Sequence, residues 1–175
     1  MFSFNKCNNV SRYKRTSSNG GSSLNSGPPG PPGPPGPTEV KSFGSLRGST
    51  IENPSEIESS VIFNEVGTVS GGITPSSSGN EFIVLESGVY QITLSISPEL
   101  SLSPDPSEPY LSAVITINGG PAFGDATSAF YIKNRSSSSF IIQADLVEGD
   151  VIGANIATSS ILGYIGRSLT LLKVS

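Results

Sequence analysis

A run of Gly-X-Y triplets places the strongest constraint on what this chain can form. Residues 27–38 read Gly-Pro-Pro-Gly-Pro-Pro-Gly-Pro-Pro-Gly-Pro-Thr, with glycine at Gly27, Gly30, Gly33 and Gly36. Proline fixes φ near the polyproline value, and only glycine fits the crowded axis where three such chains meet. We therefore predict that three chains run together here; a stiff proline-rich linker is the alternative. Because four triplets are too few to hold a triple helix alone, this interpretation requires that another part of the chain forms trimers.

The composition divides the chain into three zones. Residues 1–26 are polar and rich in Ser, Asn and Gly, residues 27–38 carry the triplets, and apolar alternation fills residues 39–175. The last zone is long enough to bury a sizeable core. We predict an N-terminal connector peptide at 1–26, a collagen-like segment at 27–38 and a folded head at 39–175.

The head has the alternating pattern of half-buried β-strands. In one run, Tyr90, Ile92, Leu94 and Ile96 fall on one face, with polar residues between them. Eight or more short strands without a helical stretch imply an all-β sandwich or jelly roll. We predict strands at 88–97, 110–118, 140–147, 151–158 and 168–174, and further strands near 40–47, 60–69, 81–86 and 127–133.

The segments that connect these strands contain residue patterns typical of turns and loops. Asn118-Gly119-Gly120 and Glu148-Gly149-Asp150 predict tight turns, because a positive φ is easily adopted there. Glu148 and Asp150 are also candidate calcium ligands, although the tight turn is the simpler interpretation. Residues 97–109 are rich in proline, which predicts a long surface loop.

The residue inventory argues against catalysis. The chain has no histidine and a single cysteine. Ser-His-Asp and Cys-His arrangements therefore cannot be built from this chain alone, and a zinc site would have only Cys7 and carboxylates as ligands. We predict a protein that is not an enzyme and that holds no cofactor or metal.

Charge is distributed unevenly along the chain. Residues 1–38 carry four basic and no acidic side chains (+4), whereas residues 39–175 carry six basic and fourteen acidic ones (−8). A basic tail would attract the acidic head of a neighbouring molecule, and a merely solvated tail is the alternative. Four charges form too small a phosphate footprint to favour nucleic-acid binding. We expect no membrane insertion, since no apolar run approaches about 20 residues, and no signal peptide, since the start lacks an apolar core.

Residues 60–175 resemble a known group of trimeric heads. A Gly-X-Y stretch leads into Phe-X-Val-X-X-X-Gly-X-Tyr-X-Ile at residues 82–92, followed by Leu-Val-Glu-Gly-Asp-Val at 146–151 and by the terminal run at 163–174. The order and spacing of these motifs are similar to those of the tumour-necrosis-factor and complement-type jelly-roll heads. Among bacterial proteins, they resemble the exosporium proteins of Bacillus spores, namely the collagen-like BclA glycoproteins and the smaller basal-layer protein that anchors them.

The resemblance implies a homotrimeric structural protein of the spore surface. It implies synthesis in the mother-cell cytoplasm and an anchoring protein of the exosporium as partner. The chain departs from the BclA pattern, because it has only four triplets and lacks the N-terminal targeting motif of that group. A short stalk with a separate N-terminal peptide is more similar to a building unit of thin spore-surface fibres, in which each N-terminal peptide docks head-to-tail into the next trimer. The alternative is a glycan- or receptor-binding head of a surface or viral fibre, since function does not follow from fold.

Several residues are candidates for assembly. Phe2 and Phe4 lie at i and i+2, so in a strand both would enter one groove of a neighbouring trimer; a disordered terminus is the alternative. Cys7 is a candidate for an interchain disulfide or is a free thiol. Aromatic side chains suit subunit interfaces and are equally suited to an ordinary core. The candidates for trimer core or interface are Tyr90, Tyr110, Phe130, Tyr131, Phe140 and Tyr164.

Overall fold

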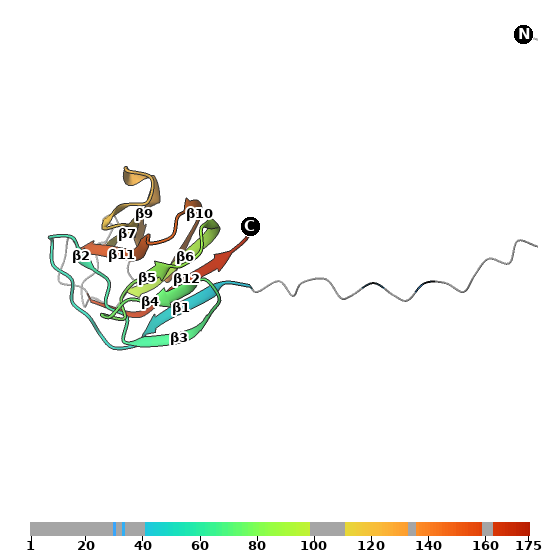
Figure 1. The fold of residues 1–175 in the computed structure, drawn as a ribbon. Coiled ribbons are helices and arrows are strands. Elements are labelled where there is room, and N and C mark those ends of the chain that lie inside the picture. The colour runs from blue at the N-terminus through green and yellow to red at the C-terminus, as the bar shows by residue number, and fades with distance from the viewer. Residues whose placement is uncertain (1–29, 31–32, 34–40, 99–110, 133–135, 159–162) are drawn as a thin grey trace, which may run out of the picture. The chain divides into compact units, whose positions relative to one another are not determined.

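Two antiparallel β-sheets enclose the apolar interior of the head (Figure 1). The computed structural model describes residues 30, 33, 41–98, 111–132, 136–158 and 163–175. Within these residues the chain forms strands, turns and one 3₁₀ turn at Ala126–Ser128, with no α-helix. The predicted all-β sandwich is confirmed.

The first sheet has five strands in the order β10-β6-β12-β1-β3. All of its neighbouring strands are antiparallel, and β6 and β12 run through its centre. Its elements are β1 (Phe43–Gly48), β3 (Glu65–Ser70), β6 (Gly88–Pro98), β10 (Ser138–Leu146) and β12 (Tyr164–Lys173).

The second sheet has seven strands and contains the path β4-β5-β11-β7-β8. Two further strands join it, since β2 pairs with β11 and β9 pairs with β7. Its elements are β2 (Ser59–Ser60), β4 (Ile73–Pro75), β5 (Phe82–Val84), β7 (Leu111–Ile117), β8 (Gly120–Pro121), β9 (Ala129–Ile132) and β11 (Val151–Thr158).

The core forms where the inward faces of the two sheets meet. Tyr90, Ile92, Leu94 and Ile96 of β6 all lie inward and are at most 1% exposed. This is the face that the sequence alternation predicts. Inward residues of β7, β11 and β12 complete a single apolar cluster, and burial of this apolar area is the main stabilising term of the head.

Both predicted turns are present. Asn118 and Gly119 adopt φ values of 53° and 80°, and Gly149 adopts 95°. In the second turn the Asp150 carboxylate accepts hydrogen bonds from the Val147 amide and from the Asn118 side chain, each at 2.8 Å. Asp150 therefore stabilises the turn itself, as the simpler of the two interpretations predicts.

Some strand bounds differ from the prediction. β12 begins at Tyr164, four residues earlier than predicted, because its register shifts between Tyr164 and Gly166 and interrupts the alternation. β6 continues to Pro98, so the first residues of the predicted 97–109 loop belong to a strand. The rest of that loop, from residue 99 onward, lies outside the described residues.

Candidate functional site

The outward face of the five-stranded sheet is the candidate functional site. Every second residue of its strands points away from the core, and the pairing registers align these residues in rows across the sheet. We call this surface the hydroxyl face. Its members are Ser139, Ile141 and Gln143 of β10; Gln91, Thr93 and Ser95 of β6; Ser168, Thr170 and Leu172 of β12; and Phe43, Ser45 and Arg47 of β1.

The middle of the hydroxyl face is small and uncharged. Its central row runs from Ile141 through Thr93 and Thr170 to Ser45. In the next row, the hydroxyls of Ser95 and Ser139 lie 2.6 Å apart and hydrogen-bond to each other. Small side chains allow another surface to approach closely, and uncharged ones avoid the large desolvation penalty of burying a charge.

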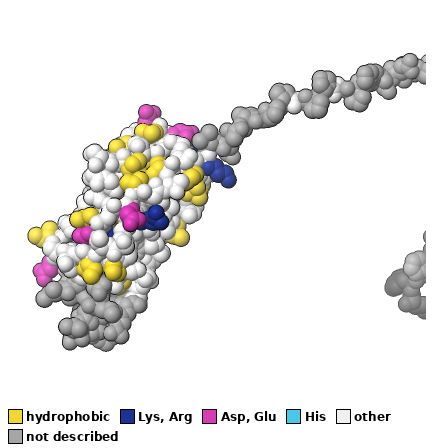
Figure 2. Space-filling view, turned by 90° about the horizontal axis from the view of Figure 1, so that it is seen from below, with side chains coloured by type: hydrophobic (Ala, Val, Ile, Leu, Met, Phe, Trp, Pro, Cys, Tyr) yellow, Lys and Arg dark blue, Asp and Glu magenta, His cyan; other side chains and the backbone are white. Residues whose placement is uncertain are grey.

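Apolar side chains accompany these hydroxyls. Ile141 is 58% exposed and Leu172 is 39% exposed, and Phe43 is half-buried. Figure 2 shows another view of the head, in which hydrophobic side chains are scattered over a mostly uncharged surface with some Lys or Arg and Asp or Glu side chains among them. Exposed apolar groups among small uncharged side chains lower the cost of covering this face with another protein surface.

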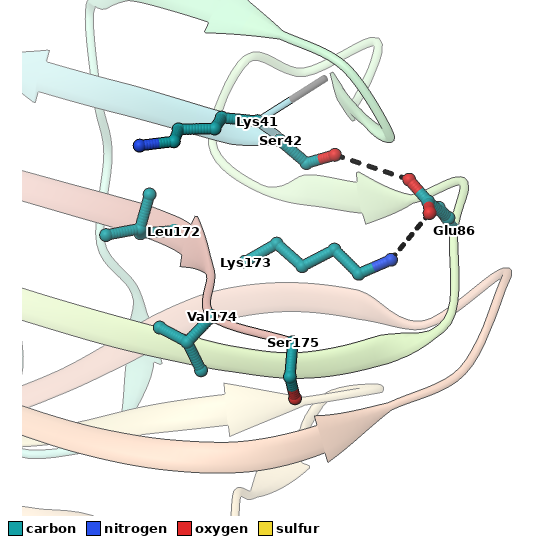
Figure 3. A pocket seen from close by; sticks show the side chains of 7 residues that line it. All are labelled: Lys41, Ser42, Glu86, Leu172, Lys173, Val174 and Ser175. Carbon is teal, nitrogen blue, oxygen red and sulfur yellow. Dashed lines mark hydrogen bonds and ion pairs between the residues drawn. The ribbon is translucent and has the colours of Figure 1, made fainter. Parts of the chain in front are cut away.

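One end of the face opens into a hollow of about 480 Å³ (Figure 3). Lys173 reaches from β12 to Glu86, with 2.6 Å between Nζ and Oε1, and Ser42 donates to the other carboxylate oxygen at 3.4 Å. The bond to Lys173 holds the pKa of Glu86 below its ordinary value. Leu172 and Val174 point away from this ion pair in Figure 3. Lys173 and Glu86 are therefore engaged with each other.

The other end of the face lies over a buried arginine. The Arg167 side chain is fully buried and donates to the carbonyls of Ile62, Thr50 and Ile165 and to the side chains of Asn64 and Glu52. Its guanidinium also stands over the Tyr164 ring, 5.2 Å from the centroid. A buried charge is tolerated when its donors are satisfied in this way. Arg167 thus fixes the segment of residues 50–64 against β12.

The aromatic assembly candidates do not form one cluster. Tyr90 and Tyr164 lie inside the head. The Tyr90 hydroxyl donates a hydrogen bond to the Glu86 carbonyl at 2.7 Å, and the Tyr164 hydroxyl accepts one from the Ile62 amide at 3.2 Å. Burial raises the pKa of both phenols. Phe130 and Phe140 are half-buried and stack on each other, with 5.5 Å between ring centroids.

Tyr131 differs from the other aromatic candidates. It is 65% exposed and belongs to the outward face of the second sheet, not to the hydroxyl face. Tyr110, Phe2, Phe4, Cys7, Gly27 and Gly36 lie outside the described residues, so their predicted roles stay predictions.

Gly30 and Gly33 are the two described glycines of the triplet run. Among the described residues, no atom lies within 4 Å of the position that a Cβ would take at either glycine. Their predicted role in a triple helix stays a prediction.

Among the described residues, no three His, Cys, Asp or Glu side chains come together as metal ligands. Within the same residues, no helix is long and apolar enough to span a membrane.

The sequence analysis did not find the hydroxyl face. Its signal is the placement of Thr93, Ser95, Ser168 and Thr170 at every second position of two strands. That pattern is also what an ordinary solvent-facing side of a strand looks like. Only the pairing of β6 with β12 shows that these residues form one continuous surface.

Comparison with known proteins identifies the fold. No protein-family model matches the chain, and no curated protein matches it either. Three solved structures are similar over 77–78% of this chain. They are Eiger TNF from S. frugiperda (14% identity, TM-score 0.54, 94% of that chain), the globular domain of the zebrafish complement 1qA protein (12%, 0.53, 98%) and pika GITRL (9%, 0.50, 98%). At this level of identity the likeness concerns the fold alone: the head is a jelly roll of the kind seen in tumour necrosis factor and complement 1q.

Proposed function

We propose that this chain is a non-enzymatic structural protein whose heads assemble into homotrimers through the hydroxyl face. The proposal places it on the surface of bacterial spores, in the exosporium, after synthesis in the mother-cell cytoplasm. The trimers stack into fibres or appendages by docking of N-terminal peptides, and an exosporium protein anchors them. The observation that carries the trimer is the uncharged middle of the hydroxyl face together with its exposed apolar residues.

The energetics of the hydroxyl face favour association. Burying Thr93, Thr170 and Ser45 against a second copy removes no charge from water, and their hydroxyls find partners among themselves or across the contact. Burying Ile141 and Leu172 adds a favourable apolar contribution of about 25 cal/mol per Å². These terms support a contact between copies more than a permanently solvated surface.

The triplet segment supports an assembly of three chains. A Gly-X-Y period has a physical reason when three chains share one axis, because only glycine fits there. Trimeric heads would supply the nucleation that four triplets lack. The triplet segment and the trimeric heads therefore support each other as parts of one assembly.

Fibre formation rests on the N-terminal segment. Phe2 and Phe4 would enter a cleft of the next trimer, the basic segment would approach an acidic head, and Cys7 would allow an interchain disulfide. Three tails per trimer give avidity without a tight single contact. The absence of histidine and the single cysteine in the sequence support a non-enzymatic role.

A charge placed at the centre of the hydroxyl face tests the trimer. Thr93→Arg should convert trimers to folded monomers, because several kcal/mol are lost when an unpaired charge is buried in a contact. Ser77→Arg, in the exposed turn between β4 and β5, is the matched control and should remain trimeric. Light scattering and circular dichroism measure mass and fold. A trimeric, folded Thr93→Arg protein would show that the hydroxyl face is not the interface.

Deletion of residues 1–15 tests the fibre separately. The shortened chain should form trimers but no fibres in negative-stain microscopy. Fibres that persist after the deletion would refute the docking mechanism and leave the trimer interface untouched.

A further inference from the structure

The outward face of the second sheet carries a groove that the proposed assembly does not use. It has a volume of about 320 Å³ and is bordered by β7, β8, β9, β11 and the segment before β2. The two sheets face each other across the core, so this groove and the hydroxyl face lie on opposite sides of the sandwich. Assembly through the hydroxyl face would leave the groove open. Its lining residues are Glu58, Ser112, Val114, Pro121, Asp125, Ala129, Tyr131 and Ala157.

The floor of the groove is apolar and made of small side chains. Val114 points outward from the sandwich, yet it is only 7% exposed. Ala129 pairs with it on β9, and Ala157 lies on the neighbouring strand β11. Such a floor accepts a flat apolar surface and offers it no hydrogen bond.

An aromatic ring stands at the side of this floor. Tyr131 is opposite Ser112 in the β7–β9 pair and is 65% exposed, so most of its ring is available to a ligand. Its ring provides a flat face, and its hydroxyl can donate or accept a hydrogen bond. Tyr131 contributes nothing to the core, so its exposure has no explanation in the packing of the head.

Two carboxylates at the groove are held in place by neighbouring groups. Glu58 Oε1 accepts from the Asn155 side chain at 2.9 Å, and Asp125 Oδ1 accepts from the Thr127 amide at 2.8 Å. Hydrogen bonds from Thr127 lower the pKa of Asp125, so this carboxylate is ionised at neutral pH. An ionised carboxylate only accepts hydrogen bonds, so a ligand must bring donors. The two carboxylates repel an anionic ligand.

We propose that this groove binds a neutral sugar ring. A pyranose presents an apolar C–H face, which matches the Tyr131 ring and the Val114 floor, and hydroxyl donors at its rim, which match Glu58 and Asp125. The volume is near the lower end of ligand pockets, about 300 Å³, so one ring fits better than a longer chain. A single ring buries little area, so we expect a dissociation constant of about 1–10 mM.

Ligand-observed NMR on the full-length protein tests this site. The probes are the methyl glycosides of glucose, galactose, mannose and N-acetylglucosamine, with glucuronate as an anionic probe and arginine amide as a cationic one. At least one neutral glycoside should give a saturable signal. Tyr131→Ala should weaken its binding about tenfold or more, whereas Tyr131→Phe, which keeps the ring, should change it by less than about threefold.

The controls separate the groove from the fold and from the trimer. Leu85→Ala, at an exposed position outside the groove, should bind like the native protein, and Tyr131→Ala should keep the native circular dichroism and mass. The proposal is overturned if no neutral glycoside saturates, if Tyr131→Ala binds as the native protein does, or if arginine amide binds while the glycosides do not. The last result would mark a cation site instead.

Discussion

Arg167 is the residue whose removal should damage the head most. The Arg167 side chain is fully buried. Its guanidinium donates hydrogen bonds to the carbonyls of three residues and forms an ion pair with Glu52. Arg167→Met keeps much of the side-chain volume but leaves these acceptors without their donor. We expect a loss of about 2–4 kcal/mol in the free energy of unfolding, measured by urea denaturation at one protein concentration.

Lys41 provides the control for this measurement. It is exposed and makes none of the contacts of Arg167. An exposed charge of this kind contributes about 0–1 kcal/mol, so Lys41→Met should be nearly neutral. Equal stabilities of the two variants would contradict the role given to Arg167.

Glu86 should make the stability of the head depend on pH. Lys173 lowers the pKa of Glu86 below its ordinary value of 4.5 in the folded protein. The contribution of this carboxylate is therefore complete above pH 4.5 and is lost as the pH falls through the lowered value. Lys173→Met should be less stable than the native protein at neutral pH, and the difference should shrink in acid.

Urea denaturation of both proteins across the acid range measures this trend. Lys41→Met, which alters a lysine of the same hollow, should show a constant difference from the native protein. A difference for Lys173→Met that is also constant with pH would exclude the Glu86 pair as its source.

At the scale of elements, the β10–β11 turn shows how one side chain fixes a connection. Asp150→Ala should cost about 1–2 kcal/mol, because the Val147 amide and the Asn118 side chain lose their acceptor. Glu148→Ala, in the same turn, should change stability by less than about 0.5 kcal/mol. Thermal denaturation with and without calcium measures both variants. A rise in melting temperature with calcium that depends on Asp150 would favour the metal-site interpretation instead.

The strands differ in how well the sequence predicts them, and the reasons are physical. β6 alternates clearly from Tyr90 onward, β11 alternates except at Gly153, and the bounds of both agree with the prediction to within one residue. The start of β12 was missed, because Gly166 lies beside a register shift and Arg167 occupies an inward position where an apolar residue is expected. β4 and β8 are too short to have a period of their own.

The candidate site was harder to predict than the strands. Alternation shows that Thr93 and Thr170 point away from the core, but it does not show that their strands are neighbours. Tyr90 and Tyr164 were candidates for both the core and the interface, because aromatic side chains suit either place; the structure puts them inside the head. Strand order and burial come from long-range pairing, which a local pattern does not encode.

At the scale of the whole molecule, the account depends on three heads meeting through their hydroxyl faces. The jelly-roll fold is established, and the composition of that face gives the reason to expect association. The groove on the opposite sheet would then remain open on the outside of the assembly. A structural head with a free sugar-binding surface is consistent with both proposals, and each can fail without the other.

Sedimentation velocity of the 175-residue chain over a wide range of dilution measures whether three copies associate. We expect a single species of about 54 kDa, three chains of 18.1 kDa each, that persists on dilution. A species of 18.1 kDa at all concentrations would contradict this expectation.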